Sequence, residues 1–256
     1  MRTCVRMTRS IDLVDQSLRL AGEGLSTSEI ARRVGVPRST IRDWLAGRLS
    51  LSWHRRGMSA GCAACGGAHD FNGLPAAYVY LLGMYLGDGC LSAHPRGIFK
   101  LRISLDARYP GIARECERAI KAVMPNNRVG RVGYGTWHEL FAYSKGWPCL
   151  FPQHGPGPKH SRKIALTEWQ ERVVGRWPAL LLRGLIDSDG CRFINTGRAW
   201  VHPRYSFANK SDDIKRIFCD VCDLMGLHWT VAGEKTIYVS RKADVAVLDG
   251  FVGPKA

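Results

Sequence analysis

The sequence lacks any apolar run long enough to cross a membrane. Its hydrophobic stretches fall short of the roughly 18 to 20 consecutive apolar residues that a membrane-spanning helix needs. The first residues, MRTCVRMTRSIDLVDQ, contain no signal-peptide core, and no low-complexity tail is present. With 256 residues, 45% of them hydrophobic, the chain has enough apolar side chains for a large core. These features exclude a membrane protein and predict a folded, cytoplasmic one.

Acidic side chains are scarce. The chain has 22 Asp and Glu against 37 Lys and Arg, which gives a formal net charge of +15. The basic excess is largest in residues 1–56 and 75–165 and small in residues 176–256. An excess that is spread over folded segments indicates several surfaces for an anionic polymer such as nucleic acid. A basic surface that is merely solvated is the alternative.

The nine cysteines are odd in number and scattered, which in a chain without a secretion signal indicates free thiols or a metal site rather than disulfides. One CxxC pattern lies in residues 49–73, a segment predicted to be a linker. With nearby histidines it gives a conceivable ligand set for one structural Zn²⁺: His54, Cys62, Cys65 and His69. Because the second CxxC of a zinc knuckle is missing, plain linker cysteines are the favoured alternative.

Two short stretches organise the chain, YLLGMYLGDGC (residues 80–90) and LLLRGLIDSDGC (residues 180–191). Each has small residues four positions apart. Because residues i and i+4 share one face of a helix, each stretch predicts a helix with a smooth stripe for close helix packing. The packing residues are Gly83, Gly87, Gly184 and Ser188. Each stretch ends in Asp-Gly, and the glycine is expected to end the helix in the left-handed conformation.

The carboxylates at these two helix ends are Asp88 and Asp189. An Asp in the last turn lies at the negative end of the helix dipole, and two such ends packed together place two carboxylates beside unpaired carbonyls. That arrangement requires a cation. Mg²⁺ fits, because it is held by one or two carboxylates with water and substrate phosphate, and paired sites of this kind serve phosphodiester cleavage. Two unrelated core helices ending in Asp-Gly are the alternative.

At these residues the chain resembles the LAGLIDADG family of homing endonucleases. LLGMYLGDG (residues 81–89) and LRGLIDSDG (residues 182–190) both fit the nine-residue motif, although Leu86 replaces the sixth-position acid that the second copy keeps as Asp187. The resemblance implies that the two eighth-position acids, Asp88 and Asp189, are catalytic and bind two or more Mg²⁺ ions. It also implies a catalytic lysine near the end of the last strand of each unit. The matching positions are Lys145 and, less clearly, Lys242 or Arg241.

The residues after each motif predict the same order of elements. The first copy predicts strands at 90–92 and 98–105, a helix at 108–124 and strands at 128–132 and 137–143. The second predicts strands at 191–195 and 204–208, a helix at 211–225, strands at 228–231 and 236–240, and a helix at 241–251. The predicted fold class is α+β, with two αββαββα units at residues 74–151 and 176–256 and a basic linker at 152–175. The resemblance implies a pseudo-twofold saddle over double-stranded DNA, formed by a monomer.

Residues 1–48 predict a small all-α domain. Ser26 and Glu29 have the spacing of a capping box, Gly35 ends a second helix, and Pro37 opens a third. This spacing resembles the helix-turn-helix of resolvases and many bacterial regulators, in which the start of the third helix reads base edges. The corresponding residues are Arg38, Ser39, Thr40 and Arg42. A helical protein-binding module of the same shape is the alternative.

Further DNA contacts are predicted on the hairpins and on the linker. Arg and Asn are the residue types that pair best with guanine and adenine in the major groove. The hairpin candidates are Arg96, Lys100, Arg102, Arg192, Asn195, Arg198, Arg204 and Lys210. In the linker, the candidates for phosphate contacts are Lys159, Arg162 and Lys163, with a solvated linker as an equal alternative.

Two functions fit these features. The first is a sequence-specific, Mg²⁺-dependent double-strand DNA endonuclease of the homing endonuclease type. The second is a transcriptional regulator on the same scaffold without cleavage activity, since some actinobacterial sporulation regulators resemble inactive members of the family. Retention of both eighth-position acids favours the enzyme, whereas the N-terminal helix-turn-helix favours the regulator. Either protein is expected in the cytoplasm of a bacterial-type cell, on the nucleoid.

Overall fold

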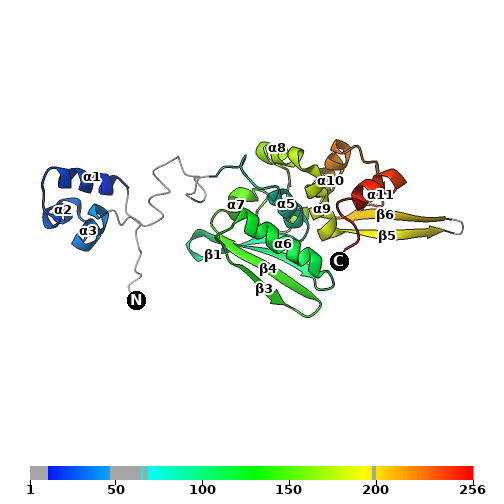
Figure 1. Ribbon diagram of the computed structural model, residues 1–256, viewed down its shortest axis with the longest axis horizontal. Coiled ribbons are helices and arrows are strands. Elements are labelled where there is room, and N and C mark those ends of the chain that lie inside the picture. The colour runs from blue at the N-terminus through cyan, green and yellow to red at the C-terminus, as the bar shows by residue number, and fades with distance from the viewer. Residues whose placement is uncertain (1–10, 47–64, 66–68, 198–199, 256) are drawn as a thin grey trace. The chain divides into compact units, whose positions relative to one another are not determined.

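The structure is a computed structural model that describes residues 11–46, 65, 69–197 and 200–255. The chain divides into two compact units, Met1–His69 and Asp70–Ala256 (Figure 1). Among the described residues, no helix is both long enough and apolar enough to cross a membrane.

The described residues of the first unit form three short helices, α1 (Ile11–Gly22), α2 (Thr27–Val34) and α3 (Arg38–Leu45). Ser26 caps α2 as predicted, because its Oγ accepts a hydrogen bond from Glu29 N at 3.3 Å while the Glu29 carboxylate accepts one from Ser26 N at 2.9 Å. Gly35 ends α2 in the left-handed conformation, with φ +69°. The apolar core comprises Val14, Leu20, Ile30, Val36, Ile41 and Trp44. The predicted all-α helix-turn-helix domain is confirmed.

The second unit repeats the order helix, two strands, helix, two strands, helix. The first copy contains α5 (Ala77–Asp88), β1 (Gly89–His94), β2 (Ile98–Asp106), α6 (Pro110–Val123), β3 (Val129–Gly133), β4 (Trp137–Ser144) and α7 (Trp147–Leu150). The second contains α9 (Pro178–Asp189), β5 (Gly190–Gly197), β6 (Trp200–Ala208), α10 (Asp212–Leu224), β7 (Trp229–Ala232), β8 (Thr236–Val239) and α11 (Lys242–Asp249). The predicted α+β class with two αββαββα units is confirmed.

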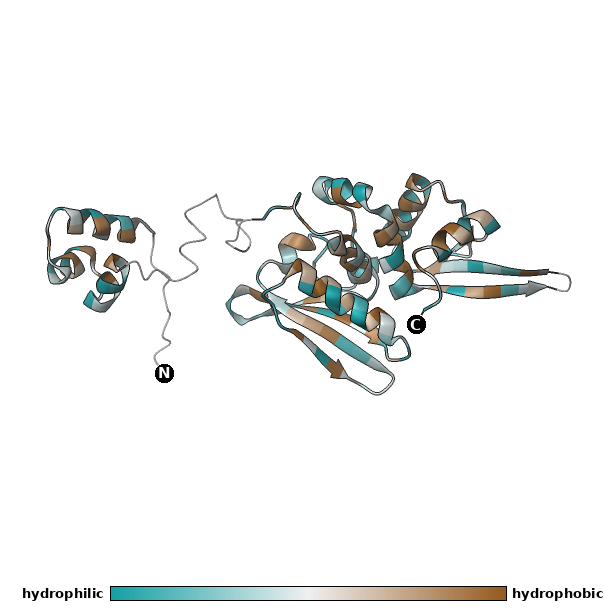
Figure 2. Ribbon diagram, viewed as in Figure 1, coloured by the Kyte–Doolittle hydropathy of each residue, from teal (hydrophilic) through white to brown (hydrophobic). Residues whose placement is uncertain are grey.

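Each copy forms one antiparallel four-stranded sheet, with equivalent strand orders β1-β2-β4-β3 and β5-β6-β8-β7. Figure 1 shows α5 and α9 in the middle of this unit, with helices over one face of each sheet. The strands alternate accordingly: in β2, Leu101, Ile103 and Leu105 are buried while the residues between them are not. In β6, Tyr205 and Phe207 are buried and Ser206 between them is not, and Figure 2 shows bands of hydrophobic and hydrophilic residues along β5 and β6. One face of each sheet is therefore core, and the other carries polar side chains.

The segment between the two copies is more ordered than the linker predicted at residues 152–175. It contains a short 3₁₀ turn, η2 (Lys159–Ser161), and the helix α8 (Glu168–Arg176). Gln170 of α8 is fully buried, where its Nε2 donates a hydrogen bond to Tyr78 Oη at 2.8 Å and its Oε1 accepts one from Gln153 Nε2 at 2.6 Å. Because buried polar groups need such partners, this network fixes the segment against α5 and corrects the linker prediction.

Candidate active site

The helices α5 and α9 pack backbone to backbone because their facing residues are small. A Cβ on Gly83 would lie 2.8 Å from Gly184 Cα, and a Cβ on Gly184 would lie 2.3 Å from the carbonyl oxygen of Tyr80. One turn later, a Cβ on Gly87 would lie 2.1 Å from Ser188 Oγ. The predicted packing residues Gly83, Gly87, Gly184 and Ser188 thus form this contact, which brings the C-terminal ends of both helices together.

The glycines that follow the two motif aspartates have extended backbone, so the expected left-handed helix end is wrong. Gly89 has φ −93° and Gly190 has φ −108°. Crowding explains both glycines: a Cβ on Gly89 would lie 2.5 Å from Tyr85 Cα, and one on Gly190 would lie 2.8 Å from Ile186 Cα. Each motif helix can therefore pass directly into the first strand of its sheet.

Asp88 and Asp189 lie half-buried at these helix ends, close enough to influence each other electrostatically. Burial and, second, the charge of Asp189 raise the pKa of Asp88 to about 6. Burial also raises the pKa of Asp189, although its Oδ2 accepts a hydrogen bond from Asn209 Nδ2 at 2.7 Å. No hydrogen bond to the Asp88 carboxylate is found among the described residues. Two half-buried carboxylates with raised pKa values are typical of a functional site.

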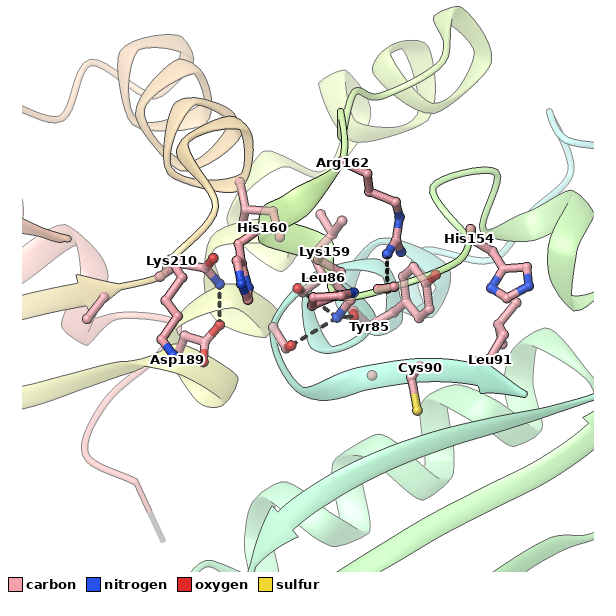
Figure 3. A pocket seen from close by; sticks show the side chains of 18 residues that line it. Tyr85, Leu86, Cys90, Leu91, His154, Lys159, His160, Arg162, Asp189 and Lys210 are labelled. Carbon is pink, nitrogen blue, oxygen red and sulfur yellow. Dashed lines mark hydrogen bonds between the residues drawn. The ribbon is translucent and has the colours of Figure 1, made fainter. Parts of the chain in front are cut away.

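Two lysines place ammonium groups at these helix ends. Lys159 Nζ donates hydrogen bonds to carbonyl oxygens in the last turn of α5, those of Tyr85, Leu86 (2.9 Å) and Gly87 (3.0 Å) (Figure 3). Lys255 Nζ donates to carbonyl oxygens in the last turn of α9, those of Asp187 (2.7 Å) and Ser188 (3.4 Å). Burial lowers the pKa of Lys159 to about 8 and lowers that of Lys255, while both motif carboxylates oppose these shifts. The cation that the sequence requires at these ends is supplied by the chain itself.

Asp88 and Asp189 face different cavities. A cavity of about 560 Å³ contains Asp189, Lys159 and the end of α5, with His160 and Lys210 also on its wall (Figure 3). A cavity of about 260 Å³ contains Asp88 and Lys255, with Ser188 at the end of α9. Each centre therefore combines the carboxylate of one motif helix with the carbonyl end of the other helix and one lysine.

The predicted catalytic lysines Lys145 and Lys242 lie elsewhere. β4 begins at Trp137, which shares a third cavity with Asp88, whereas Lys145 follows the opposite end of this strand. Lys242 is the exposed first residue of α11, beside Arg241, which lines a separate cleft. Neither lysine lines a cavity that contains Asp88 or Asp189, whereas Lys159 and Lys255 do. A catalytic role for Lys145 or Lys242 stays a prediction.

A repeated tripeptide in the sequence marks these two lysines. Both close a Gly-Pro-Lys segment, at residues 157–159 and 253–255. The two glycines have positive φ values, +73° for Gly157 and +67° for Gly253. Glycine adopts this conformation without strain, and proline fixes the next φ, so each segment makes a defined turn before its lysine. Reasoning from the sequence missed this repeat and assigned Lys159 only to phosphate contact.

Several predicted DNA contacts lie on the sheet faces that point away from the helices. Lys100 and Arg102 in β2 both pair with Glu139 of β4, at 2.6 Å and 3.8 Å, so part of their charge is neutralised. In the second sheet, the Asn195 amide oxygen accepts a hydrogen bond from Arg204 Nη1 at 2.9 Å when the amide is oriented to suit its neighbours. Arg96 is exposed at the first hairpin turn, and Lys210 is exposed after β6.

Arg192 is on the helix-covered face, which corrects its assignment to DNA. It pairs in register with the buried Tyr205, and its Nε and Nη2 donate hydrogen bonds to Asp249 of α11 at 2.7 Å and 2.9 Å. In the segment between the two copies, the Arg162 guanidinium donates hydrogen bonds to the carbonyl oxygens of Gln153 and Gly157. Arg162 and Lys159 thus donate hydrogen bonds to backbone carbonyls within the protein, while Lys163 is exposed. Arg198 lies outside the described residues.

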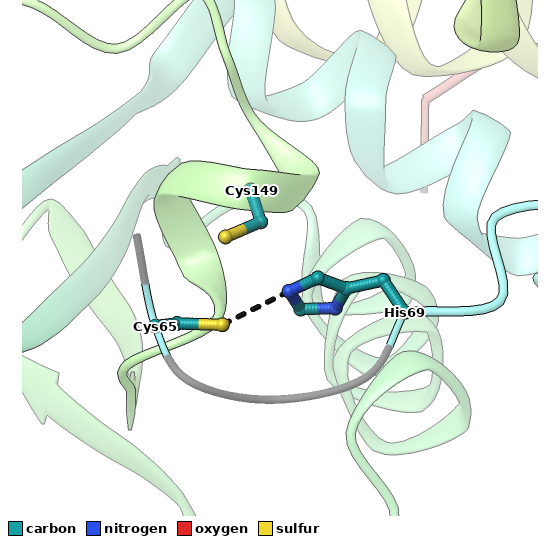
Figure 4. A group of neighbouring side chains, drawn as sticks. All are labelled: Cys65, His69 and Cys149. Atoms are coloured by element: carbon teal, nitrogen blue, oxygen red, sulfur yellow. Dashed lines mark hydrogen bonds between the residues drawn. The ribbon is translucent and has the colours of Figure 1, made fainter. Parts of the chain in front are cut away.

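In the first unit, the predicted base-reading residues occupy the first turns of α3. Arg38, Ser39 and Arg42 are exposed and Thr40 is half-buried. Of the predicted zinc ligands, His54 and Cys62 lie outside the described residues. Cys65 Sγ lies 3.0 Å from His69 Nε2 (Figure 4), and burial lowers the pKa of His69, which favours the neutral imidazole that a metal requires. A zinc site that includes this pair stays a prediction.

Comparison with known proteins gives one family model and several solved structures. Residues 16–47 match the model of the Homeodomain-like domain. No curated protein matches the chain.

The crystal structure of I-DmoI in complex with DNA and Mn is similar at 16% identity, over 70% of this chain and 96% of that chain, with a TM-score of 0.48. The N-terminal LAGLIDADG domain of DUF199/WhiA is similar at 15% identity, over 72% and 86% of the two chains, with a TM-score of 0.47. The LAGLIDADG meganuclease I-AabMI bound to uncleaved DNA is similar at 11% identity, over 68% and 82%, with a TM-score of 0.43. The chemistry of the site therefore rests on this chain's own residues.

Proposed function

We propose that this chain binds a specific double-stranded DNA site and hydrolyses both strands with Mg²⁺. The observation that carries the proposal is the pair of half-buried carboxylates, Asp88 and Asp189, at the adjoining ends of two glycine-packed helices. Keeping two neighbouring carboxylates half-buried, with raised pKa values, costs stability, which a purely structural helix pair has no reason to accept. Two carboxylate centres in one chain suit the two strands of a duplex.

The donor atoms at these centres suit Mg²⁺, which prefers carboxylate and carbonyl oxygens. Asp189 would hold the ion in one centre and Asp88 in the other. When bound, Mg²⁺ acidifies water and offsets the negative charge that develops on the phosphate. Asn209 orients Asp189 through its 2.7 Å hydrogen bond. Lys159 and Lys255 each provide an ammonium that lines the cavity of one centre and can stabilise the same developing charge.

In this proposal the two sheets form the DNA-binding saddle. Their outer faces carry Lys100 and Arg102 in one copy and Asn195 and Arg204 in the other, and Arg with Asn are suited to base edges in the major groove. Because the two copies lie in one chain, a monomer supplies the approximate twofold that a duplex presents. The helix-turn-helix adds a second contact with DNA through the start of α3.

A transcriptional regulator without cleavage activity is the second candidate. One observation favours it: the chain's own lysines already place positive charge beside both carboxylates, so the folded centre does not need a metal. Leu86, at the motif position that carries Asp187 in the second copy, also makes the two centres unequal.

Selection from a randomised duplex library separates the two functions. The selection runs in Ca²⁺ and in Mg²⁺, and bound and cut molecules are recovered separately. For the endonuclease we expect one long site that is bound in Ca²⁺ and cut in Mg²⁺. Asp88→Asn and Asp189→Asn should each abolish double-strand cleavage while the Kd changes little. A site that is bound in both metals and never cut would establish the regulator instead.

A further inference from the structure

Each copy in the second unit is followed by a Gly-Pro-Lys segment, at residues 157–159 and 253–255, that returns to a motif helix. Lys159 Nζ lies 2.9 Å from the carbonyl oxygen of Leu86 and 3.0 Å from that of Gly87. Lys255 Nζ lies 2.7 Å from the carbonyl oxygen of Asp187 and 3.4 Å from that of Ser188. These carbonyls occupy the sixth and seventh positions of the two motifs. The two Gly-Pro-Lys segments lie at different distances along the sequence from their motifs, and yet they make the same contact.

Several acceptor groups hold each lysine in this contact. Lys159 Nζ reaches three carbonyl oxygens of one helix turn, and Lys255 Nζ reaches two. Each ammonium also lies near an aromatic ring, Lys159 at 5.0 Å from the Tyr85 centroid and Lys255 at 5.7 Å from that of Tyr109. Holding a flexible lysine half-buried costs conformational entropy and desolvation, which only a closely matched set of acceptors offsets.

The oxygens that these lysines contact or face are the ones a divalent ion would use. The carbonyl ends of α5 and α9 and the carboxylates of Asp88 and Asp189 are the oxygen donors of the two centres. An ammonium that is already hydrogen-bonded there repels a divalent cation and occupies the carbonyl lone pairs. Replacing the lysine by an uncharged residue of similar length removes both obstacles.

We propose that Lys159 and Lys255 are resident cations, which keep both carboxylate centres closed to divalent ions in the free protein. In the free protein they hold the helix ends and the carboxylates in place without metal. Entry of an ion then requires the ammonium to move, and a DNA phosphate drawn into the cavity offers it another anionic partner. This last step rests on the proposed DNA binding, whereas exclusion of ions from the free protein does not.

Binding of Mn²⁺ to the DNA-free protein tests the proposal. Free Mn²⁺ is quantified by electron paramagnetic resonance during titration of the wild type, Lys159→Met and Lys255→Met. We expect weak binding to the wild type, and one additional Mn²⁺ in each variant that binds at least about tenfold more tightly, because a nearby unit charge has been removed. Lys210→Met is the matched control, since Lys210 lines the same cavity as Asp189 but does not cap α5. Adding Asp189→Asn to Lys159→Met should abolish the new site.

Thermal unfolding provides an independent readout. In EDTA, Lys159→Met and Lys255→Met should lower the Tm, and Mn²⁺ should raise the Tm of the variants more than that of the wild type. A merely structural lysine would lower the Tm without this metal rescue. Lys255 lies in the C-terminal segment, so Lys255→Met keeps the test open if Lys159→Met fails to fold. Mn²⁺ bound by the wild type as tightly as by the variants would overturn the proposal, whether or not the protein cleaves DNA.

Discussion

Asp88 is the residue whose environment departs furthest from what an aspartate needs. It is half-buried, it lies near a second carboxylate, and its pKa is raised to about 6 from an ordinary 3.8. The folded protein therefore retains a proton on Asp88 at pH values where the unfolded chain has lost it. By linkage, the contribution of Asp88 to the free energy of unfolding falls as the pH rises from about 4 to about 6, and stays low above that range.

Asp88→Asn should therefore stabilise the metal-free protein at neutral pH. The amide resembles the protonated acid, so the variant keeps the stability that the wild type has lost by about pH 6. The gain in the free energy of unfolding is on the order of 2 kcal/mol. Urea unfolding in EDTA between pH 4 and pH 8 measures the difference, which should shrink towards zero at the acidic end. Asp106→Asn is a control of opposite sign, because hydrogen bonds from Arg108 lower the pKa of Asp106 to about 2. Destabilisation by Asp88→Asn at pH 7 would contradict the raised pKa.

The sequence was sufficient to predict the carboxylates of the site but not its lysines. Asp88 and Asp189 occupy the same position of a repeated motif, so the sequence pattern alone was enough to predict that they are equivalent. Lys159 and Lys255 lie 71 and 66 residues beyond those acids, and only the path of the folded chain returns them to the helix ends. Lys145 and Lys242 follow the last strand of each copy, but neither lines a cavity that contains Asp88 or Asp189.

At the scale of elements, the pairing of α5 with α9 depends on the absence of side chains at their crossing. Gly184→Ala places a Cβ 2.3 Å from the Tyr80 carbonyl oxygen, and that oxygen belongs to helix backbone that cannot move aside. We expect a loss of about 3 kcal/mol in the free energy of unfolding, the upper range for overpacking. Chemical denaturation monitored by circular dichroism measures it.

Gly175→Ala in α8 is the matched control for the helix crossing. A Cβ on Gly175 meets no atom within 4 Å. Because alanine has the higher helix propensity, this variant should be neutral or up to about 1 kcal/mol more stable. Destabilisation by Gly184→Ala no larger than that by Gly175→Ala would contradict the close approach of α5 and α9, because the gain in helix propensity is common to both substitutions.

The sheets show why alternation alone could not assign the DNA contacts. Strand alternation requires Arg192 and Asn195 to face opposite sides, but it does not say which side is covered by helices. The Arg192–Asp249 ion pair reveals the covered side, and α11, which supplies Asp249, is 50 or more residues later in the chain. Similarly, α8 was absent from the predicted elements because its burial depends on Gln153 and Tyr78, which lie far away in the sequence.

Arg204→Ala and Arg192→Ala should separate DNA affinity from stability. Arg204 is on the outer face beside Asn195, so its loss should weaken binding to the selected site by about 1–3 kcal/mol if it contacts a base. Arg192→Ala should leave the Kd unchanged and lower the free energy of unfolding by about 1 kcal/mol, because it removes a partly exposed ion pair. Fluorescence anisotropy at several salt concentrations and denaturant unfolding provide the two readouts. An unchanged Kd for Arg204→Ala together with a weakened one for Arg192→Ala would reverse the assignment of the faces.

At the scale of the whole molecule, the chain combines two units with separate cores. The core of the helix-turn-helix unit includes Ile30, Ile41 and Trp44, whereas the core of the second unit is continuous across both copies. This division was readable from the sequence, since the capping box and the paired motifs each lie within one unit. In the proposed function such a chain would bind DNA at two places, and the covalent connection would raise the effective concentration of the second contact once the first has formed.

The double variant Arg38→Ala, Arg42→Ala tests this division in the full-length chain. Both side chains are exposed at the start of α3 and away from either core, so the Tm should not change. We expect weaker binding with a salt dependence reduced by about one to two units of slope, because up to two phosphate or base contacts are lost. In a footprint on the selected duplex, protection should disappear from one flank only, and the section protected by the second unit should persist with its cleavage pattern unchanged. Loss of protection over the entire site would mean that the first unit, rather than the two sheets, provides the sequence-specific contact, and the second unit would then serve the regulator rather than the endonuclease.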